Sequence, residues 1–176
     1  MITHVLPCGA TYGRMNNFLG SHQNKLDAKG RVSVPASFRA ALRQPGDVNG
    51  AAVQLVLRPS HLHSCIEAWP TSRFETLAKP LEHFSPLSTE HEDLAASIYG
   101  DAYPVEADKE GRILIPDQLA AHAGLTEAVM FIGMGTTFQI WEPAAGERRR
   151  AEARIRARDL TPPRVSPQSQ PLAAAQ

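Results

Sequence analysis

Cysteine and long apolar segments are both scarce in this chain. Only Cys8 and Cys65 occur among its 176 residues, so we do not expect a disulfide scaffold. No apolar run approaches the roughly 20 residues that a membrane-spanning helix requires. The first 14 residues also lack the basic start and apolar stretch of a secretory signal. We therefore expect a protein of the reducing cytoplasm with no membrane partner.

Net charge and catalytic signatures are missing as well. The 18 basic and 18 acidic residues cancel, so no whole-molecule field attracts the chain to nucleic acid, and any basic surface must be local. There is no Gly-rich phosphate loop, nucleophile elbow or His-Glu-x-x-His motif. His61 and His63 could ligate zinc, but no second cluster supplies the remaining ligands. We predict no enzyme activity, no metal, no cofactor and no small-molecule substrate.

What the chain does contain is an internal repeat. Residues 26–35 align with residues 107–116 at an offset of 81. The identical residues in this register are Asp27 and Asp108, Gly30 and Gly111, Arg31 and Arg112, and Pro35 and Pro116. Trp69 and Trp141 extend the match, but they lie 72 apart because the first copy has a longer internal loop. Each copy spans about 50 residues, near the lower limit for independent folding, so the two copies should pack together.

Each copy predicts a tight turn followed by a strand. The carboxylate of Asp27 can accept a hydrogen bond from the backbone N–H two residues on, and Gly30 permits the positive φ that the reversal requires. Polar and apolar residues then alternate, the period of a half-buried strand, so Arg31 should face away from the core. A short helix and two further strands follow, the first of them at 53–57 and 129–132. The expected fold class is α+β and rich in β structure.

Helices are predicted between the copies and after the second one. Ser72 and Glu75 form a capping-box pattern at the start of the first helix, which Pro80 should end or kink. The second helix should start near Thr89, with Glu92 as its capping partner. The expected organisation is a flexible extension (1–17), a first repeat unit (18–70), a helical connector (71–98), a second unit (99–143), a C-terminal helix (144–158) and a disordered tail (159–176).

The two copies differ in local charge. Residues 18–43 contain five basic residues against one acid, a net charge of +4, whereas residues 101–117 contain two basic and five acidic residues, a net charge of −3. Since phosphate contacts supply most non-specific affinity for DNA, the first copy is the stronger candidate for DNA contact. Arg112 should lie in a more sheltered Asp–Arg pair.

Two features remain open to more than one interpretation. Arg31 suits contact with phosphate or guanine, because its guanidinium is a planar fork, but it also suits a structural ion pair with Asp27. Residues 146–159 carry six arginines and three acids, a net charge of +3. This range is either a solvated helix face or a contact surface for DNA or a partner.

The stretch Asn24–Pro35 and its echo at Asp108–Pro116 closely resemble the MraZ family of bacterial transcriptional regulators, over roughly residues 18–158. The resemblance implies that each copy is a swapped-hairpin β-barrel domain of the SpoVT-AbrB type. It also implies that the copies interlock about a pseudo-twofold axis and that chains assemble into rings. Family members tend to begin near the equivalent of Phe18, so Met15 is a candidate for the true first residue.

The resemblance also implies a function. The Asp-x-x-x-Arg motif would face DNA, which nominates Asp27, Arg31, Asp108 and Arg112, and charge and turn position add Lys25, Lys29 and Lys109. The expected partners are double-stranded DNA, at tandem promoter repeats ahead of the division and cell-wall gene cluster, and further copies of the chain. We expect repression of that cluster, including the regulator's own gene, by a nucleoid-associated protein. The alternative is an antitoxin-like DNA-binding protein that neutralises a toxin, but such antitoxins usually carry one copy of the motif.

Overall fold

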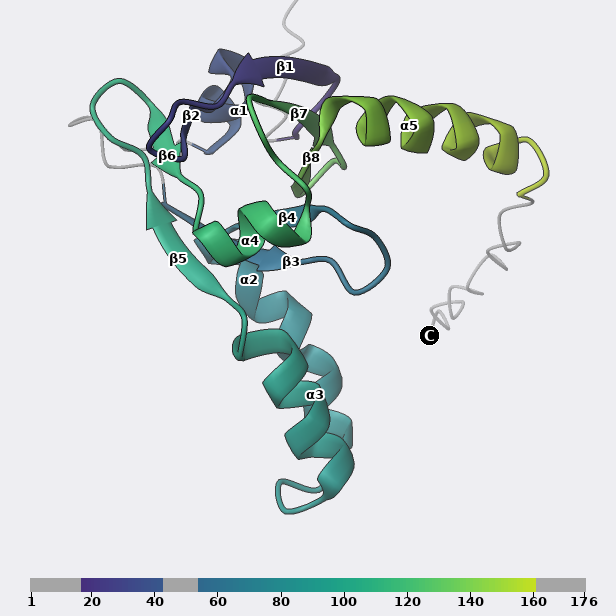
Figure 1. Cartoon of the computed structure of the whole chain (residues 1–176). Coiled ribbons are helices and arrows are strands. Elements are labelled where there is room, and N and C mark those ends of the chain that lie inside the picture. Colours follow the sequence, from purple (N-terminus) through teal and green to yellow (C-terminus); the bar gives the residue numbers. More distant parts are fainter. Residues whose placement is uncertain (1–16, 43–53, 161–176) are drawn as a thin grey trace, which may run out of the picture.

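The computed structural model describes residues 17–42 and 54–160. The expected N-terminal extension and tail lie almost entirely outside these ranges, as do Cys8 and Arg43. The described residues form a strand-rich α+β fold, as the sequence predicts (Figure 1). Its elements are β1 (Ser21–Lys25), β2 (Arg31–Ser33), α1 (Ala36–Leu42), β3 (Gln54–Pro59), β4 (Ile66–Pro70), α2 (Thr71–Ala78), the 3-10 helix η1 (Lys79–His83), α3 (Thr89–Tyr99), β5 (Tyr103–Glu106), β6 (Arg112–Leu114), α4 (Asp117–His122), β7 (Ala128–Gly133), β8 (Phe138–Trp141) and α5 (Pro143–Ala157).

Strands of the two copies are interleaved in one antiparallel sheet. The sheet has the order β1-β7-β8-β4-β3-β5, and β2 pairs with β6 in a separate two-stranded ribbon. The first strand of each copy therefore pairs with the third strand of the other copy, β1 with β7 and β5 with β3. This exchange confirms the expectation that the two copies pack together.

The strand pairing is symmetric under exchange of the copies. The β1·β7 and β5·β3 pairings have the same register when equivalent residues are compared. At the centre of the ribbon Val32 opposes its own equivalent, Ile113, and at the centre of the sheet Glu67 opposes its own equivalent, Gln139. An approximate twofold axis through these two pairs relates the copies.

No closed barrel is found among the described strands. β1 and β5 stand at the two ends of the sheet order, and each has one strand neighbour. The expected barrel in each copy is therefore not seen. Because each copy's first strand lies on the other copy, the six strands form one shared sheet instead of closing on a single copy.

An aromatic cluster from both copies fills the core. Phe18 and Phe38 of the first copy and Phe131 and Phe138 of the second copy are each at most 1% exposed. The ring of Phe138 lies 5.0 Å from that of Phe18 and 5.1 Å from that of Phe38. Since burial of apolar surface is the main favourable contribution to folding, this shared cluster makes the stability of each copy depend on the other.

The helices between the copies form a hairpin that projects from the sheet (Figure 1). α2 ends two residues before Pro80, as the sequence predicts, and η1 continues the chain. The two capping predictions are wrong. α2 starts directly after β4 at Pro70, with no side-chain cap, so Ser72 already lies in the first turn. The cap of α3 is Ser88, whose Oγ accepts a hydrogen bond from the His91 N–H at 3.2 Å.

The C-terminal helix α5 agrees with its predicted range. Its first turn is capped by the Glu142 carboxylate, which accepts hydrogen bonds from the N–H groups of Ala144 at 3.0 Å and Ala145 at 2.7 Å. These bonds lower the pKa of Glu142. No helix in the described ranges is long and apolar enough to cross a membrane.

Candidate nucleic-acid interface

The turn of the first copy is built on one carboxylate oxygen of Asp27. Oδ1 accepts hydrogen bonds from the backbone N–H groups of Lys29 and Arg31, both at 2.9 Å. Gly30 has a φ of +74°, which residues with a side chain rarely adopt. The backbone closes the turn as predicted, with the Gly30 N–H donating to the Asp27 carbonyl oxygen at 3.0 Å.

The second oxygen of Asp27 holds the arginine. Oδ2 lies 2.9 Å from Nε and 2.8 Å from Nη2 of Arg31. A guanidinium has five N–H bonds in a rigid plane, so this pairing uses two of them and leaves three for another acceptor. The side chains of Arg31 and Asp27 are 36% and 38% exposed, so the pair lies at the surface.

The second copy repeats this geometry atom for atom. Oδ1 of Asp108 accepts from the N–H groups of Glu110 at 3.0 Å and Arg112 at 2.8 Å, while Oδ2 lies 2.8 Å from both Nε and Nη2 of Arg112. One contact is added, because Nη2 of Arg112 also donates to Glu110 at 3.0 Å. Arg112 is therefore more fully occupied within its own turn than Arg31.

The expectation of a more sheltered second pair is wrong. Arg112 is 34% exposed and Arg31 is 36% exposed, so burial does not distinguish them. The difference lies in one turn residue, since Glu110 occupies the position that Lys29 holds in the first copy. The two copies differ in local charge, as predicted. The difference reaches Arg112 through its hydrogen bond to the Glu110 carboxylate, and not through deeper burial of the Asp108–Arg112 pair.

Both aspartates are held in the charged form. The backbone hydrogen bond from Arg31 is the main cause that lowers the pKa of Asp27, and the equivalent bond from Arg112 lowers the pKa of Asp108. The hydrogen bond to Asp108 raises the pKa of Arg112, to which Asp27 of the other copy also contributes. The two ion pairs thus lie within electrostatic reach of each other.

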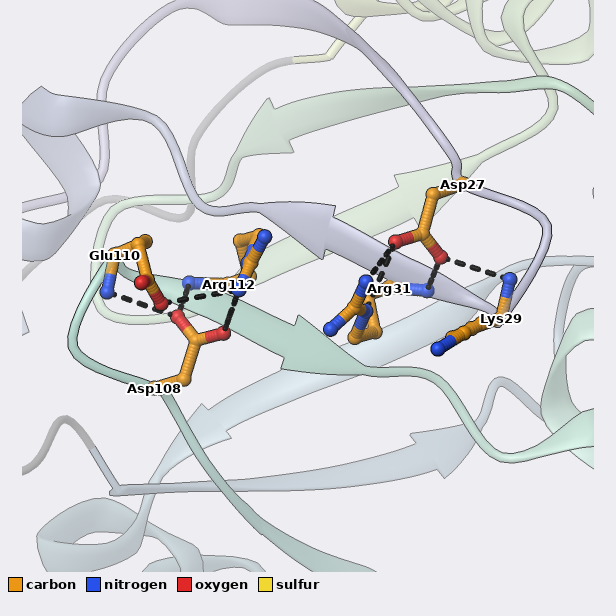
Figure 2. A network of polar contacts seen from close by, with 6 residues as sticks. All are labelled: Asp27, Lys29, Arg31, Asp108, Glu110 and Arg112. Carbon is orange, nitrogen blue, oxygen red and sulfur yellow. Dashed lines mark hydrogen bonds and ion pairs between the residues drawn. The ribbon is translucent and has the colours of Figure 1, made fainter.

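The ribbon places both arginines on one face. Arg31 opposes Leu114 and Ser33 opposes Arg112, so the two arginines are diagonal neighbours on the same side of an antiparallel pair. Figure 2 shows the two Asp–Arg pairs side by side on β2 and β6. The opposite side carries Val32 and Ile113, which are buried in the core. A rigid ribbon therefore presents two pre-positioned guanidinium groups outward.

Two of the three lysines in the predicted set lie in the turns that precede the ribbon strands, and the third lies on β1 beside β2. Lys29 and Lys109 are exposed in the two turns, and Lys25 is exposed at the end of β1. Seven predicted residues are thus brought together around β2 and β6, from parts of the chain that are 81 residues apart.

Arg39 is a further cation at this surface that the motif did not nominate. It belongs to α1, and its Nη1 donates to the Val34 carbonyl oxygen at 2.6 Å. Its side chain lies against the other copy's turn, since a Cβ on Gly111 would meet Arg39 Cδ at 2.6 Å. The sequence shows the charge of Arg39, but only the exchange of the copies places that charge beside the second turn.

The histidines considered as zinc ligands do not form a metal cluster. In residues 17–42 and 54–160, no group of three or more His, Cys, Asp or Glu side chains could hold a metal ion. Those histidines line a cavity on another part of the molecule.

Fold and site together define a β-rich α+β protein in which two copies of one unit exchange strands and present paired Asp–Arg turns. A family model described as "MraZ protein, putative antitoxin-like" matches residues 17–96 and 98–158. The chain belongs to the MraZ family.

Curated relatives carry the same family name. A "Transcriptional regulator MraZ" of Gluconacetobacter diazotrophicus is 60% identical over 149 residues, covering 85% of this chain and 93% of the relative. That of Gluconobacter oxydans is 57% identical over 162 residues, covering 90% and 95%. That of Pelagibacter ubique is 41% identical over 140 residues, covering 80% and 87%.

Proposed function

We propose that this protein regulates transcription by binding double-stranded DNA through the β2–β6 ribbon and its two turns. The observation that carries the proposal is the pair of surface arginines, each fixed by an aspartate on the same face of a rigid ribbon. The names of the relatives support the regulatory role. A two-stranded antiparallel ribbon fits the major groove of B-DNA, which is about 12 Å wide.

The ion pair and the DNA contact are compatible functions of Arg31. Asp27 restricts the guanidinium to one orientation, so that less side-chain entropy is lost when the remaining N–H groups meet a phosphate or guanine. Lys25, Lys29 and Lys109 add phosphate contacts that position the ribbon. Asp27 and Asp108 act through the arginines that they hold.

The finer proposal concerns the target and the assembly. The exchange of strands supports a pair of swapped-hairpin units, 18–70 and 99–143, joined by the connector 71–98. Chains form a ring that binds tandem promoter repeats ahead of the division and cell-wall gene cluster, represses it together with the regulator's own gene, and is associated with the nucleoid. Several weak contacts on one ring would raise the effective concentration at tandem sites.

Gel-shift titration against the chain's own upstream DNA at fixed salt tests the DNA interface. Arg31→Ala should weaken binding about tenfold or more, because a base or phosphate contact of an arginine contributes roughly 1–3 kcal/mol. Arg112→Ala should have a smaller effect. Arg73→Ala, an exposed arginine on α2, is the charge-matched control and should bind like wild type. If both ribbon variants bind as tightly as this control, the proposed interface is wrong.

A second substitution tests the role assigned to Glu110. Glu110→Lys gives the second turn the charge of the first and removes the contact of Nη2 with Glu110, while Nη2 keeps its pairing with Asp108. Affinity should therefore rise by roughly threefold or more near 0.1 M salt. The slope of affinity against salt should become steeper, because more counterions are released. Unchanged affinity and slope would show that the second turn does not reach DNA.

The ring is tested separately by sedimentation of the purified chain. A monomer at micromolar concentration would contradict the ring and the multivalent mechanism. The antitoxin-like wording of the family description supports the alternative function, a DNA-binding antitoxin that neutralises a toxin. This alternative predicts a toxin gene beside this gene and a stable complex of the two proteins.

A further inference from the structure

A cavity of about 690 Å³ lies between the β3–β4 loop, the end of α4 and the α5 helix. Its volume falls in the range of about 300–1,000 Å³ that is typical of small-molecule sites. Three arginines of α5, Arg148, Arg149 and Arg156, line it together with His61, His63 and His122. Glu152 is the one acidic residue of the lining, so the cavity is positively charged.

The walls of this cavity are held in place by hydrogen bonds. The loop 60–65 is closed by the Ser60 N–H, which donates to the Cys65 carbonyl oxygen at 2.9 Å. His122 at the end of α4 lies 3.2 Å, through Nε2, from the carbonyl oxygen of His63. The His63 ring lies 5.5 Å from the ring of Trp141, which also lines the cavity. The loop is therefore tied to α4 through His122 and packed on the end of β8 through Trp141.

The arginines of the cavity have unmet bonding capacity. Arg156 is paired with Glu152 at 3.2 Å, but Arg148 and Arg149 form no ion pair among the described residues. Nε of Arg149 is buried and has no hydrogen-bond partner there, although buried N–H groups almost always have one. Burial lowers the pKa of His63, and the positive charges of Arg149 and Arg156 lower it further. An anion in the cavity would supply the missing acceptor for Arg149 and the missing counter-charge for Arg148 and Arg149.

The basic lining of this cavity is not repeated in the residues that the approximate twofold axis makes equivalent. The β7–β8 loop, 134–137, is two residues shorter than the loop 60–65 and contains no histidine or serine. At the offset of 72 that relates β4 to β8, Arg148 and Arg149 correspond to Thr76 and Leu77 of α2. The basic residues that line the cavity are therefore not a consequence of the internal repeat, because their equivalents in the other copy are not basic.

We propose that this cavity binds a small phosphate-bearing anion of nucleotide size, gripped by Arg148 and Arg149. A guanidinium presents N–H groups in the geometry that phosphate oxygens accept bidentately. The site is separate from the proposed DNA surface, because α5 and the β2–β6 ribbon lie on opposite sides of the molecule in Figure 1. It is a place where a metabolite can bind a chain whose ribbon remains free for DNA.

Isothermal titration of the full chain with ATP at low salt tests the site, with adenosine as the probe that lacks phosphate. Wild type should bind ATP and not adenosine, and Arg148→Gln with Arg149→Gln should weaken binding at least tenfold. Arg148→Gln alone, at an exposed position, should already weaken it severalfold and does not depend on refolding of a buried group. Arg150→Gln is the matched control, because Arg150 is paired with Glu147 at 3.1 Å outside the cavity.

A second arm separates this site from the DNA surface, since both would recognise phosphate. The Arg31→Ala, Arg112→Ala double variant should retain wild-type affinity for ATP. Loss of ATP binding in that variant would place the anion on the ribbon and overturn the proposal. The same holds if wild type fails to bind ATP at millimolar concentration, or if Arg148→Gln and Arg150→Gln bind it equally well.

Discussion

At the scale of single residues, the aspartate of the repeated motif has two functions, and each of its carboxylate oxygens performs one of them. Oδ1 orders the turn by accepting two backbone N–H groups, and Oδ2 orients the arginine. Alanine would lose both functions, and asparagine would keep at most the first, because only a carboxylate can hold the guanidinium as an ion pair. This explains why the motif needs an acid at its first position even on a surface that we propose to face DNA.

The lowered pKa values of Asp27 and Asp108 give a pH dependence with a definite sign. Each folded value lies below the ordinary 3.8, so the carboxylates stabilise the turns at every pH above the ordinary value. That stabilisation is lost as the pH falls through the folded pKa. We expect the Nε–H resonances of Arg31 and Arg112 to be unchanged from about pH 8 to pH 5 and to shift only below about pH 4.

An NMR titration measures this directly, with Asp27→Asn as the control. The variant should lose the acid transition at Arg31 and keep it at Arg112. A transition midpoint near pH 6, or one that survives at Arg31 in the variant, would contradict the assignment of these carboxylates.

At the scale of elements, the position of α5 depends on a glycine. Gly146 is buried in the first half of the helix, and a Cβ there would lie 2.9 Å from the sulfur of Met130 and 3.2 Å from Cβ of Trp141. The backbone of α5 therefore packs directly on β7 and the end of β8. This close approach brings the arginines of α5 over the cavity.

Gly146→Val should separate α5 from the sheet. Overpacking of this kind costs about 1–3 kcal/mol, so the melting temperature should fall by several degrees, and ATP affinity should fall with it. Thermal unfolding followed by circular dichroism measures the first effect. Ala151→Val, at an exposed position of the same helix, controls for helix propensity and should change stability by less than about 1 kcal/mol. Equal melting of the two variants would show that the close packing is not required.

At the scale of the whole molecule, the exchange of strands makes two short units into one folding unit. Both outer strands pair with the other copy, and the aromatic cluster takes two phenylalanines from each. Neither copy can form its sheet or its core alone. The chain should therefore unfold in a single cooperative transition.

The tryptophans provide one probe for each copy. In Trp141→Phe only Trp69 reports on the first copy, and in Trp69→Phe only Trp141 reports on the second. In each variant, urea unfolding followed by tryptophan fluorescence should coincide with unfolding followed by circular dichroism. A fluorescence midpoint clearly displaced from the circular dichroism midpoint in either variant would show that the copies unfold independently.

Local features were set by the sequence alone. The Asp27 turn, the outward direction of Arg31, the helix after each proline and the range of α5 depend on residues within about one turn or strand of each other. Backbone sterics, hydrogen bonding and hydrophobic period therefore predict them. The capping errors at α2 and α3 are displacements of one or two residues. At α3 the neighbouring Ser88 and Thr89 compete for the same backbone N–H groups, whereas α2 follows β4 directly and has no side-chain cap.

Long-range features required the tertiary structure. The repeat indicated that the copies pack, but not that each outer strand crosses to the other copy, because strand pairing is decided by the summed burial of both halves. The contact of Arg39 with the second turn depends on the interleaving of the two copies. The pairing of β4 with β8 brings the β3–β4 loop of the first copy to the helices of the second, so that three histidines and three arginines surround one cavity. The sequence by itself thus determined the chemistry of each turn, and the strand pairing between the two copies decided which turns, cations and cavity walls lie together.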